Sequence, residues 1–101
     1  TYVEKVVRKK WKGEAKNIMI DFVNSVVDHS TLAAEQFQEA LNASAEKNNS
    51  GAGSVMQLLR VAVTGEEGGP DLMKIMEIIG TQETSSRINS AITEFDKITA
   101  E

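Results

Sequence analysis

Residues 55–64 read Val-Met-Gln-Leu-Leu-Arg-Val-Ala-Val-Thr, and this stretch decides the fold class. Its apolar residues follow the i, i+3, i+4, i+7, i+8 spacing of one helix face, at Val55, Leu58, Leu59, Ala62 and Val63. A short apolar run with β-branched residues is also compatible with a strand. The sequence contains no second strand-like segment, and an isolated strand would leave its backbone hydrogen bonds without partners. We therefore predict a central buried helix.

Three further helices are predicted on the N-terminal side, over 2–11, 14–27 and 33–45. Gly13 separates the first two, and a turn at 28–31 supplies a hydroxyl as the N-cap of the third. Each helix carries apolar residues four positions apart, as a helix with one buried face requires. These stripes are Val3, Val7 and Trp11, then Ile18, Phe22 and Val26, then Ala33, Phe37, Leu41 and Ala45.

The C-terminal part is predicted to hold two more helices. Glycine-rich and polar stretches at 46–53 and 65–69 are predicted loops. Pro70 stands at the N1 position of the next helix and Gly80 at its C′ position, while Thr81 caps a last helix. Together these patterns predict an all-α fold, a bundle of five or six helices around one core.

Composition excludes several classes of protein. The chain has 101 residues, of which 41% are apolar and 26% charged, as expected for one globular domain. No apolar run reaches the roughly 20 residues that span a bilayer, and nothing resembles a signal peptide. The chain has no cysteine and only one histidine, His29, in a turn-like context, which argues against disulfides, a catalytic triad or a histidine metal site. Because it begins with Thr1, we expect a piece of a longer chain.

The charge is distributed unevenly along the chain. Residues 1–16 carry six basic and two acidic groups, whereas the other 85 residues carry five basic and thirteen acidic ones. The whole chain therefore has a net charge of −4 despite a positive end. Such an end is found on surfaces that face a polyanion, but a short charge run on its own more often indicates a solvated helix end. The possible phosphate contacts are Arg8, Lys9, Lys10 and Lys12.

Arg60 and the loop at 65–69 are the other candidates for binding. Arg60 is the one charge in an apolar helix, so it either reaches the surface or contacts a partner. The glycines of the loop allow close approach to backbone N–H groups. Glu66 and Glu67 would repel a phosphate, and no Lys-Ser/Thr pair follows, which excludes a nucleoside-triphosphate P-loop. A simple connection between helices remains the alternative.

Three stretches then carry a resemblance to a known family. They are Leu-Arg-Val-Ala-Val-Thr-Gly at 59–65, Gly-Pro-Asp-Leu at 69–72 and Ile-Ile-Gly-Thr-Gln-Glu-Thr at 78–84, followed by Arg87-Ile88. In this order and spacing they resemble the C-terminal anticodon-binding region of bacterial-type glutamyl-tRNA synthetases, which are class I aminoacyl-tRNA synthetases. The resemblance is close over 54–92 and rests on helical pattern elsewhere. Met73 replaces a commoner aromatic residue of the family.

The resemblance implies a role in tRNA anticodon recognition within a glutamate–tRNA ligase, an enzyme that attaches glutamate to tRNA(Glu). Carried over by position, the anticodon contacts fall on Arg60, Gly69, Pro70, Leu72 and Met73. The catalytic motifs of the family are missing from this sequence. We therefore expect no catalytic site, cofactor or metal in this stretch, and expect the parent enzyme to use ATP and Mg²⁺ elsewhere.

These considerations define the expected organisation and partners. Residues 1–12 are expected to end a preceding helical segment, and 13–101 to form the helical anticodon-binding domain. The expected partners are the anticodon loop of tRNA(Glu) and an upstream catalytic domain of the same chain, with no membrane and no DNA, in the cytoplasm. The alternative is an acidic helical protein-interaction domain without a nucleic-acid role, which would expose an apolar patch. An independent enzyme would need a catalytic pair that the sequence does not supply.

Overall fold

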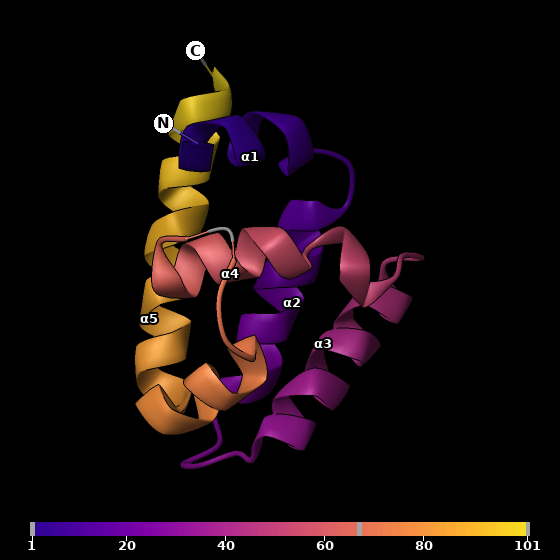
Figure 1. The fold of residues 1–101 in the computed structure, drawn as a ribbon. Coiled ribbons are helices and arrows are strands. Elements are labelled where there is room, and N and C mark those ends of the chain that lie inside the picture. Colours follow the sequence, from indigo (N-terminus) through magenta and orange to yellow (C-terminus); the bar gives the residue numbers. More distant parts are fainter. Residues whose placement is uncertain (1, 67, 101) are drawn as a thin grey trace.

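A computed structural model describes residues 2–66 and 68–100, and Figure 1 shows its helices. Their order is α1 (Tyr2–Lys10), α2 (Ala15–Val26), α3 (Ala34–Lys47), the 3₁₀ helix η1 (Ala52–Ser54), α4 (Met56–Thr64) and α5 (Leu72–Ala100). The described residues contain no strand, so the predicted all-α class is confirmed. Glu67 of the predicted loop and the side chain of Val3 of the first predicted stripe lie outside the described part.

The long helix α5 organises the packing, because it contacts each of the other four α-helices. The helices α2 and α3 lie side by side, and α1 packs against both α4 and α5 (Figure 1). Among the described helices, none combines the length and apolarity needed to cross a bilayer. Whether the chain divides into two domains at residue 12 stays a prediction.

The core is built from the predicted apolar stripes. The largest side chains without solvent exposure include Phe22 of α2, Phe37 and Leu41 of α3, and Leu58 and Leu59 of α4. The 55–64 stretch is thus a central buried helix, as predicted. Full burial of such side chains contributes about 1.5–3 kcal/mol each, which explains why their spacing sets the fold.

Gly80 divides α5 into two helical segments. Its φ and ψ angles are 90° and 169°, a backbone conformation that is essentially restricted to glycine. The helix therefore consists of two segments, 72–79 and 81–100, joined at a bend. The prediction that a helix stops at Gly80 is confirmed, and counting both segments gives six α-helical segments within the described residues, besides the 3₁₀ helix η1.

Two predicted helix caps, the hydroxyl of the turn at 28–31 and Thr81, and the predicted N1 position of Pro70 are wrong. The turn at 28–31 supplies no hydroxyl, because α3 begins at Ala34 and its N-cap Ala33 donates its N–H to Oε1 of Gln36 at 2.8 Å. Pro70 is not N1, because α5 begins at Leu72.

The residues that take over these roles explain the difference. The carboxylate of Asp71 accepts the N–H of Met73 at 3.0 Å and so caps α5. The hydroxyl of Thr81 donates to the backbone oxygen of His29 at 2.6 Å, which links α5 to the turn after α2 instead of capping its own helix. Tertiary packing has therefore replaced local capping at Thr81.

Candidate nucleic-acid interface

The α4–α5 loop, residues 65–71, is fixed at both ends. Gly65 ends α4 in the left-handed conformation, with φ of 79°, and donates its N–H to the oxygen of Val61. The Thr64 hydroxyl donates to the oxygen of Arg60 at 2.7 Å and accepts the N–H of Glu66 at 3.1 Å. At the other end Asp71 caps α5. Both ends of the loop are thus held in place by hydrogen bonds.

Arg60 reaches across this loop. Its Nη1 donates a hydrogen bond to the backbone oxygen of Pro70 at 2.6 Å. Gly69 lies beside the same guanidinium, since a Cβ at this position would stand 3.5 Å from Nη1 of Arg60. The structure therefore brings three of the predicted anticodon contacts together, Arg60, Gly69 and Pro70. Their role stays a prediction.

The other two predicted anticodon contacts point into the protein. Leu72 and Met73 are only 2% and 5% exposed and belong to the hydrophobic core. Their side chains support the start of α5 from within, below the loop. Both residues therefore present little surface to a partner.

Arg87 is a functional candidate to which the sequence analysis gave no role. Its Nη1 donates to the backbone oxygen of Val63 at 2.8 Å, and its Nε donates to Oε2 of Glu83 at 2.7 Å. Because Val63 lies in the last turn of α4, this arginine ties α5 to the end of α4 from which the loop departs. From sequence, the i, i+4 spacing to Glu83 indicates only a surface ion pair.

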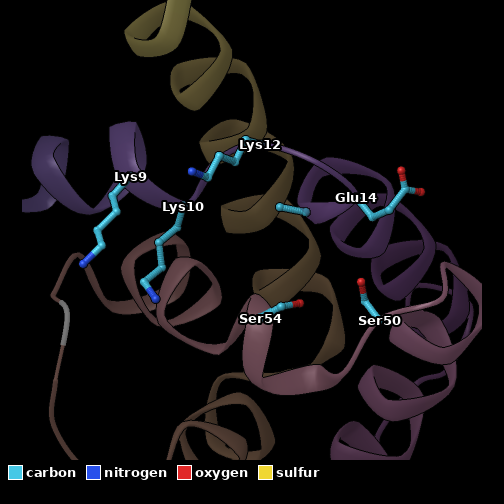
Figure 2. A pocket seen from close by; sticks show the side chains of 7 residues that line it. Lys9, Lys10, Lys12, Glu14, Ser50 and Ser54 are labelled. Atoms are coloured by element: carbon cyan, nitrogen blue, oxygen red, sulfur yellow. The ribbon is translucent and has the colours of Figure 1, made fainter.

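Three of the four predicted phosphate contacts surround one surface depression of about 430 Å³. Figure 2 shows Lys9 and Lys10 from the end of α1 and Lys12 from the connection to α2 on one side of it, with Ser50 and Ser54 on the other. Arg8 is not part of this lining; it forms an ion pair with Glu4 at 2.9 Å. We call this feature the lysine depression. Glu14 and Ala15 complete its lining.

No metal site accompanies these features in the part of the chain that the structure describes. It contains no group of three or more histidine, cysteine or acidic side chains placed to hold a metal ion. The candidate interface is therefore an arginine beside a glycine-containing loop whose two ends are held by hydrogen bonds, together with a separate group of lysines.

Comparison with known proteins identifies the class to which such a helical bundle belongs. Residues 1–92 match the model of a family described as an anticodon binding domain, and the chain therefore belongs to this family. No solved structure matches the chain with significance.

The relatives to which the chain is similar are glutamate–tRNA ligases. The chain is 34% identical over 92 residues to a glutamate–tRNA ligase of Porphyromonas gingivalis, covering 91% of this chain and 18% of the relative. It is 34% identical over 93 residues to a glutamate–tRNA ligase of Cytophaga hutchinsonii, covering 91% of this chain and 18% of that protein. The chain is 37% identical over 93 residues to a glutamate–tRNA ligase 2 of Nitratiruptor sp., covering 92% of this chain and 20% of that protein. The chain thus spans about a fifth of the length of these relatives, in keeping with the resemblance seen in the sequence.

Proposed function

We propose that this chain recognises the anticodon loop of tRNA(Glu), as one domain of a glutamate–tRNA ligase that uses ATP and Mg²⁺. Its membership of the anticodon-binding family and its similarity to glutamate–tRNA ligases support this proposal. The single structural observation that carries it is the 2.6 Å hydrogen bond from Arg60 to Pro70, which places a guanidinium at the α4–α5 loop.

The chemistry of this arrangement suits an unpaired RNA loop. Splayed bases are recognised by stacking, by backbone groups and by arginine. The guanidinium of Arg60 has five N–H donors, and the oxygen of Pro70 occupies one nitrogen only, so other donors remain for a base edge. Gly69 lacks a side chain, which allows a base to approach the backbone of the loop. Leu72 and Met73 hold the loop from inside.

The other parts of the enzyme would lie outside this chain. We propose that the catalytic domain precedes it in the same polypeptide, that ATP and Mg²⁺ bind there, and that the enzyme is cytoplasmic. In this arrangement the chain contributes selection of the tRNA and no chemical step.

The alternative, an acidic protein-interaction domain, receives less support from the surface. Among the described residues, the large hydrophobic side chains that are exposed are Ile20 at 37% and Ile78 at 80%. They lie on different helices, α2 and α5, and isolated apolar residues are ordinary on protein surfaces. The surface therefore favours recognition of a polar, charged partner.

Binding to RNA stem-loops tests the proposal. A fluorescently labelled stem-loop with the tRNA(Glu) anticodon is compared with one that carries an altered anticodon, for the wild-type chain and for Arg60→Gln and Arg60→Lys. We expect the wild-type chain to prefer the cognate loop, and both variants to lose about tenfold in affinity for it, because Lys cannot form the planar paired contacts of Arg. Lys47→Gln, which removes one positive charge from α3, is the matched control. Equal wild-type affinity for the two loops would contradict the proposal.

A further inference from the structure

The lysine depression collects positive charges that have no acidic partner. In the described residues, five basic side chains form ion pairs with carboxylates: Arg8, Lys16, Lys47, Lys74 and Arg87. Lys9, Lys10 and Lys12 form none, although acidic groups outnumber basic ones in this chain by 15 to 11. Three lysines around one depression repel one another, and this repulsion is relieved when an anion binds between them.

The position of the depression relates it to the α4–α5 loop. The helix α1 packs against α4, the helix that carries Arg60 and leads into the loop. Figure 2 shows Lys9 and Lys10 reaching from α1 toward the ribbon of α4, and Ser54 lies just before α4 begins. The lysines of α1 and Arg60 in the middle of α4 therefore lie on two helices that pack against each other, and both are within reach of one extended ligand.

The lining favours a phosphodiester backbone over a specific small anion. Lysines are flexible point charges that attract phosphates without selecting a sequence. The hydroxyl of Ser50 can donate to a phosphate oxygen, whereas the hydroxyl of Ser54 donates to the backbone oxygen of Gly51 at 2.8 Å and shapes the edge of the depression. Glu14 borders the same depression and repels a phosphate, which confines the backbone to the lysine side. An acidic peptide would be attracted by the same lysines, but it offers no bases for Arg60 and the loop.

We propose that the lysine depression, with Lys9, Lys10 and Lys12 facing Ser50 and Ser54, binds the phosphate backbone of the RNA whose unpaired bases contact the α4–α5 loop. The inference rests on the proposed function and extends it. Arg60 and the loop distinguish one anticodon from another, whereas the depression contributes affinity that is independent of sequence and sensitive to salt.

The salt dependence of RNA binding tests this inference. The triple variant Lys9→Gln/Lys10→Gln/Lys12→Gln is compared with the wild-type chain and with a control, Lys47→Gln/Lys74→Gln/Lys97→Gln, which loses the same charge elsewhere. Affinities for both stem-loops are measured between about 50 and about 200 mM salt. We expect the slope of log affinity against log salt, which is negative, to become less steep by about 2 in the triple variant, since each of three lost phosphate contacts on a single strand contributes about −0.7. We expect the control to keep the wild-type slope, and the preference for the cognate loop to persist in all three chains.

A substitution that should strengthen RNA binding provides an independent test of the inference. Glu14→Gln removes the one carboxylate of the lining, and we expect it to strengthen binding of both stem-loops about two- to threefold at low salt. Glu14 is exposed, so the fold should be retained, and thermal denaturation of every variant verifies this.

The outcomes separate the inference from the proposed function. A wild-type slope in the folded triple variant overturns the inference, while the comparison of anticodons still decides the proposed function. Competition by millimolar inorganic phosphate that fully displaces the RNA would assign the depression to free phosphate, and equal binding of poly-glutamate would assign it to acidic peptides. Either result overturns the inference. If the wild-type chain binds neither stem-loop, both proposals fail.

Discussion

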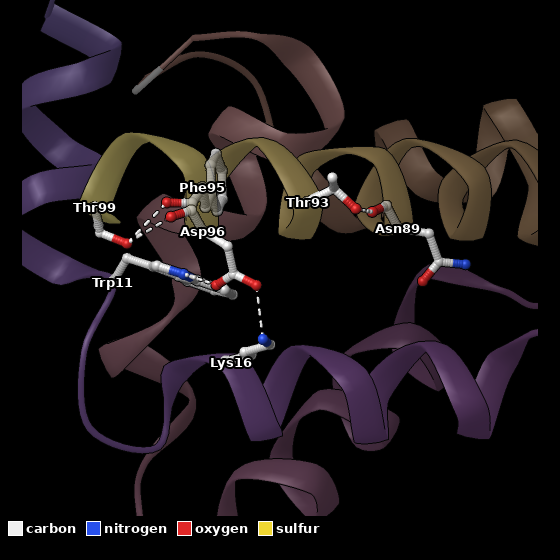
Figure 3. A network of polar contacts seen from close by, with 7 residues as sticks. All are labelled: Trp11, Lys16, Asn89, Thr93, Phe95, Asp96 and Thr99. Atoms are coloured by element: carbon white, nitrogen blue, oxygen red, sulfur yellow. Dashed lines mark hydrogen bonds and ion pairs between the residues drawn. The ribbon is translucent and has the colours of Figure 1, made fainter. Parts of the chain in front are cut away.

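Trp11 donates a hydrogen bond from Nε1 to Oδ1 of Asp96 at 2.9 Å, across 85 positions of the sequence. The other oxygen of the same carboxylate accepts a hydrogen bond from Nζ of Lys16 at 2.6 Å. The ring of Trp11 also meets Phe95 edge to face, with the ring centroids 5.2 Å apart (Figure 3). These contacts fix the end of α1 against α5, and so they fix the lysine depression relative to α4.

Asp96 makes this link dependent on pH. The Lys16 ammonium and then the Trp11 N–H hold the pKa of Asp96 below its ordinary value. Because the pKa is lower in the folded than in the unfolded chain, the link stabilises the fold fully above about pH 4, and this contribution is lost as the pH falls through the folded pKa. We expect Asp96→Asn to lower stability at pH 7 by at most about 1 kcal/mol, since the side chain is 44% exposed, and to lose less stability on acidification.

Urea denaturation at pH 7 and below pH 4 measures both effects. Asp28→Asn, which removes one carboxylate from an exposed turn, is the control for charge. Parallel loss of stability on acidification in wild-type chain and Asp96→Asn would show that Asp96 does not carry this dependence.

Gly80 is the backbone position at which substitution should cost most. A Cβ there would meet nothing within 4 Å, so strain at φ of 90° is the only penalty. We expect Gly80→Ala to destabilise the chain by about 1–3 kcal/mol, as measured by thermal or urea denaturation. Gly53→Ala also meets nothing within 4 Å but is not at positive φ, and it should be neutral or slightly stabilising. Equal stability of the two variants would mean that the bend does not require glycine.

Arg87 should position the α4–α5 loop without touching RNA. We expect Arg87→Gln and Arg87→Lys each to cost about 0.5–1.5 kcal/mol and to shift the amide resonances of residues 64–66. Lysine should not rescue the arginine, because one ammonium cannot replace separate donors to Val63 and Glu83. Lys74→Gln, which breaks a surface ion pair with Glu77, should leave these resonances unchanged. If Arg87→Lys has the stability and the amide resonances of the wild-type chain, the positive charge of residue 87 alone would explain its role.

Core packing predicts a large contrast between two substitutions. Phe37 has no exposure and packs near Phe22, with ring centroids 6.4 Å apart. We expect Phe37→Ala to destabilise the chain by about 3–5 kcal/mol in urea denaturation. Ile78→Ala removes a side chain that is 80% exposed and should stay within about 0.5 kcal/mol of the wild-type chain. Similar losses of stability in the two variants would contradict the described packing of the core.

The helices were predictable because burial imposes a period that the sequence displays. Phe37 and Leu41, four positions apart, both lie in the core. The helix ends were less predictable, because several neighbouring residues can begin or cap a helix. Contacts with distant residues then decide which of them does so. Asp71 caps α5, which therefore begins at Leu72 instead of at Pro70, and the Thr81 hydroxyl donates to the backbone oxygen of His29, 52 positions away.

The residues of the candidate site could likewise be predicted from the sequence only in part. Sequence could select Arg60 because an arginine in an apolar helix is unusual, but its contact with Pro70 depends on the path of an irregular loop. The burial of Leu72 and Met73 follows from how α5 packs after its Asp71 cap, which no local pattern specifies. The contact of Arg87 with Val63 spans 24 positions and is visible only in three dimensions.

The most direct test of anticodon recognition is an NMR titration of the ¹⁵N-labelled chain with the tRNA(Glu) anticodon stem-loop and with a stem-loop of altered anticodon. We expect the signals of Arg60, Gly69 and Leu72 to shift with the cognate loop and to shift less with the altered one. Signals of 5–16 should shift about equally with both. Shifts confined to 5–16, or identical shifts of Arg60, Gly69 and Leu72 with the two loops, would contradict recognition of the anticodon by the α4–α5 loop.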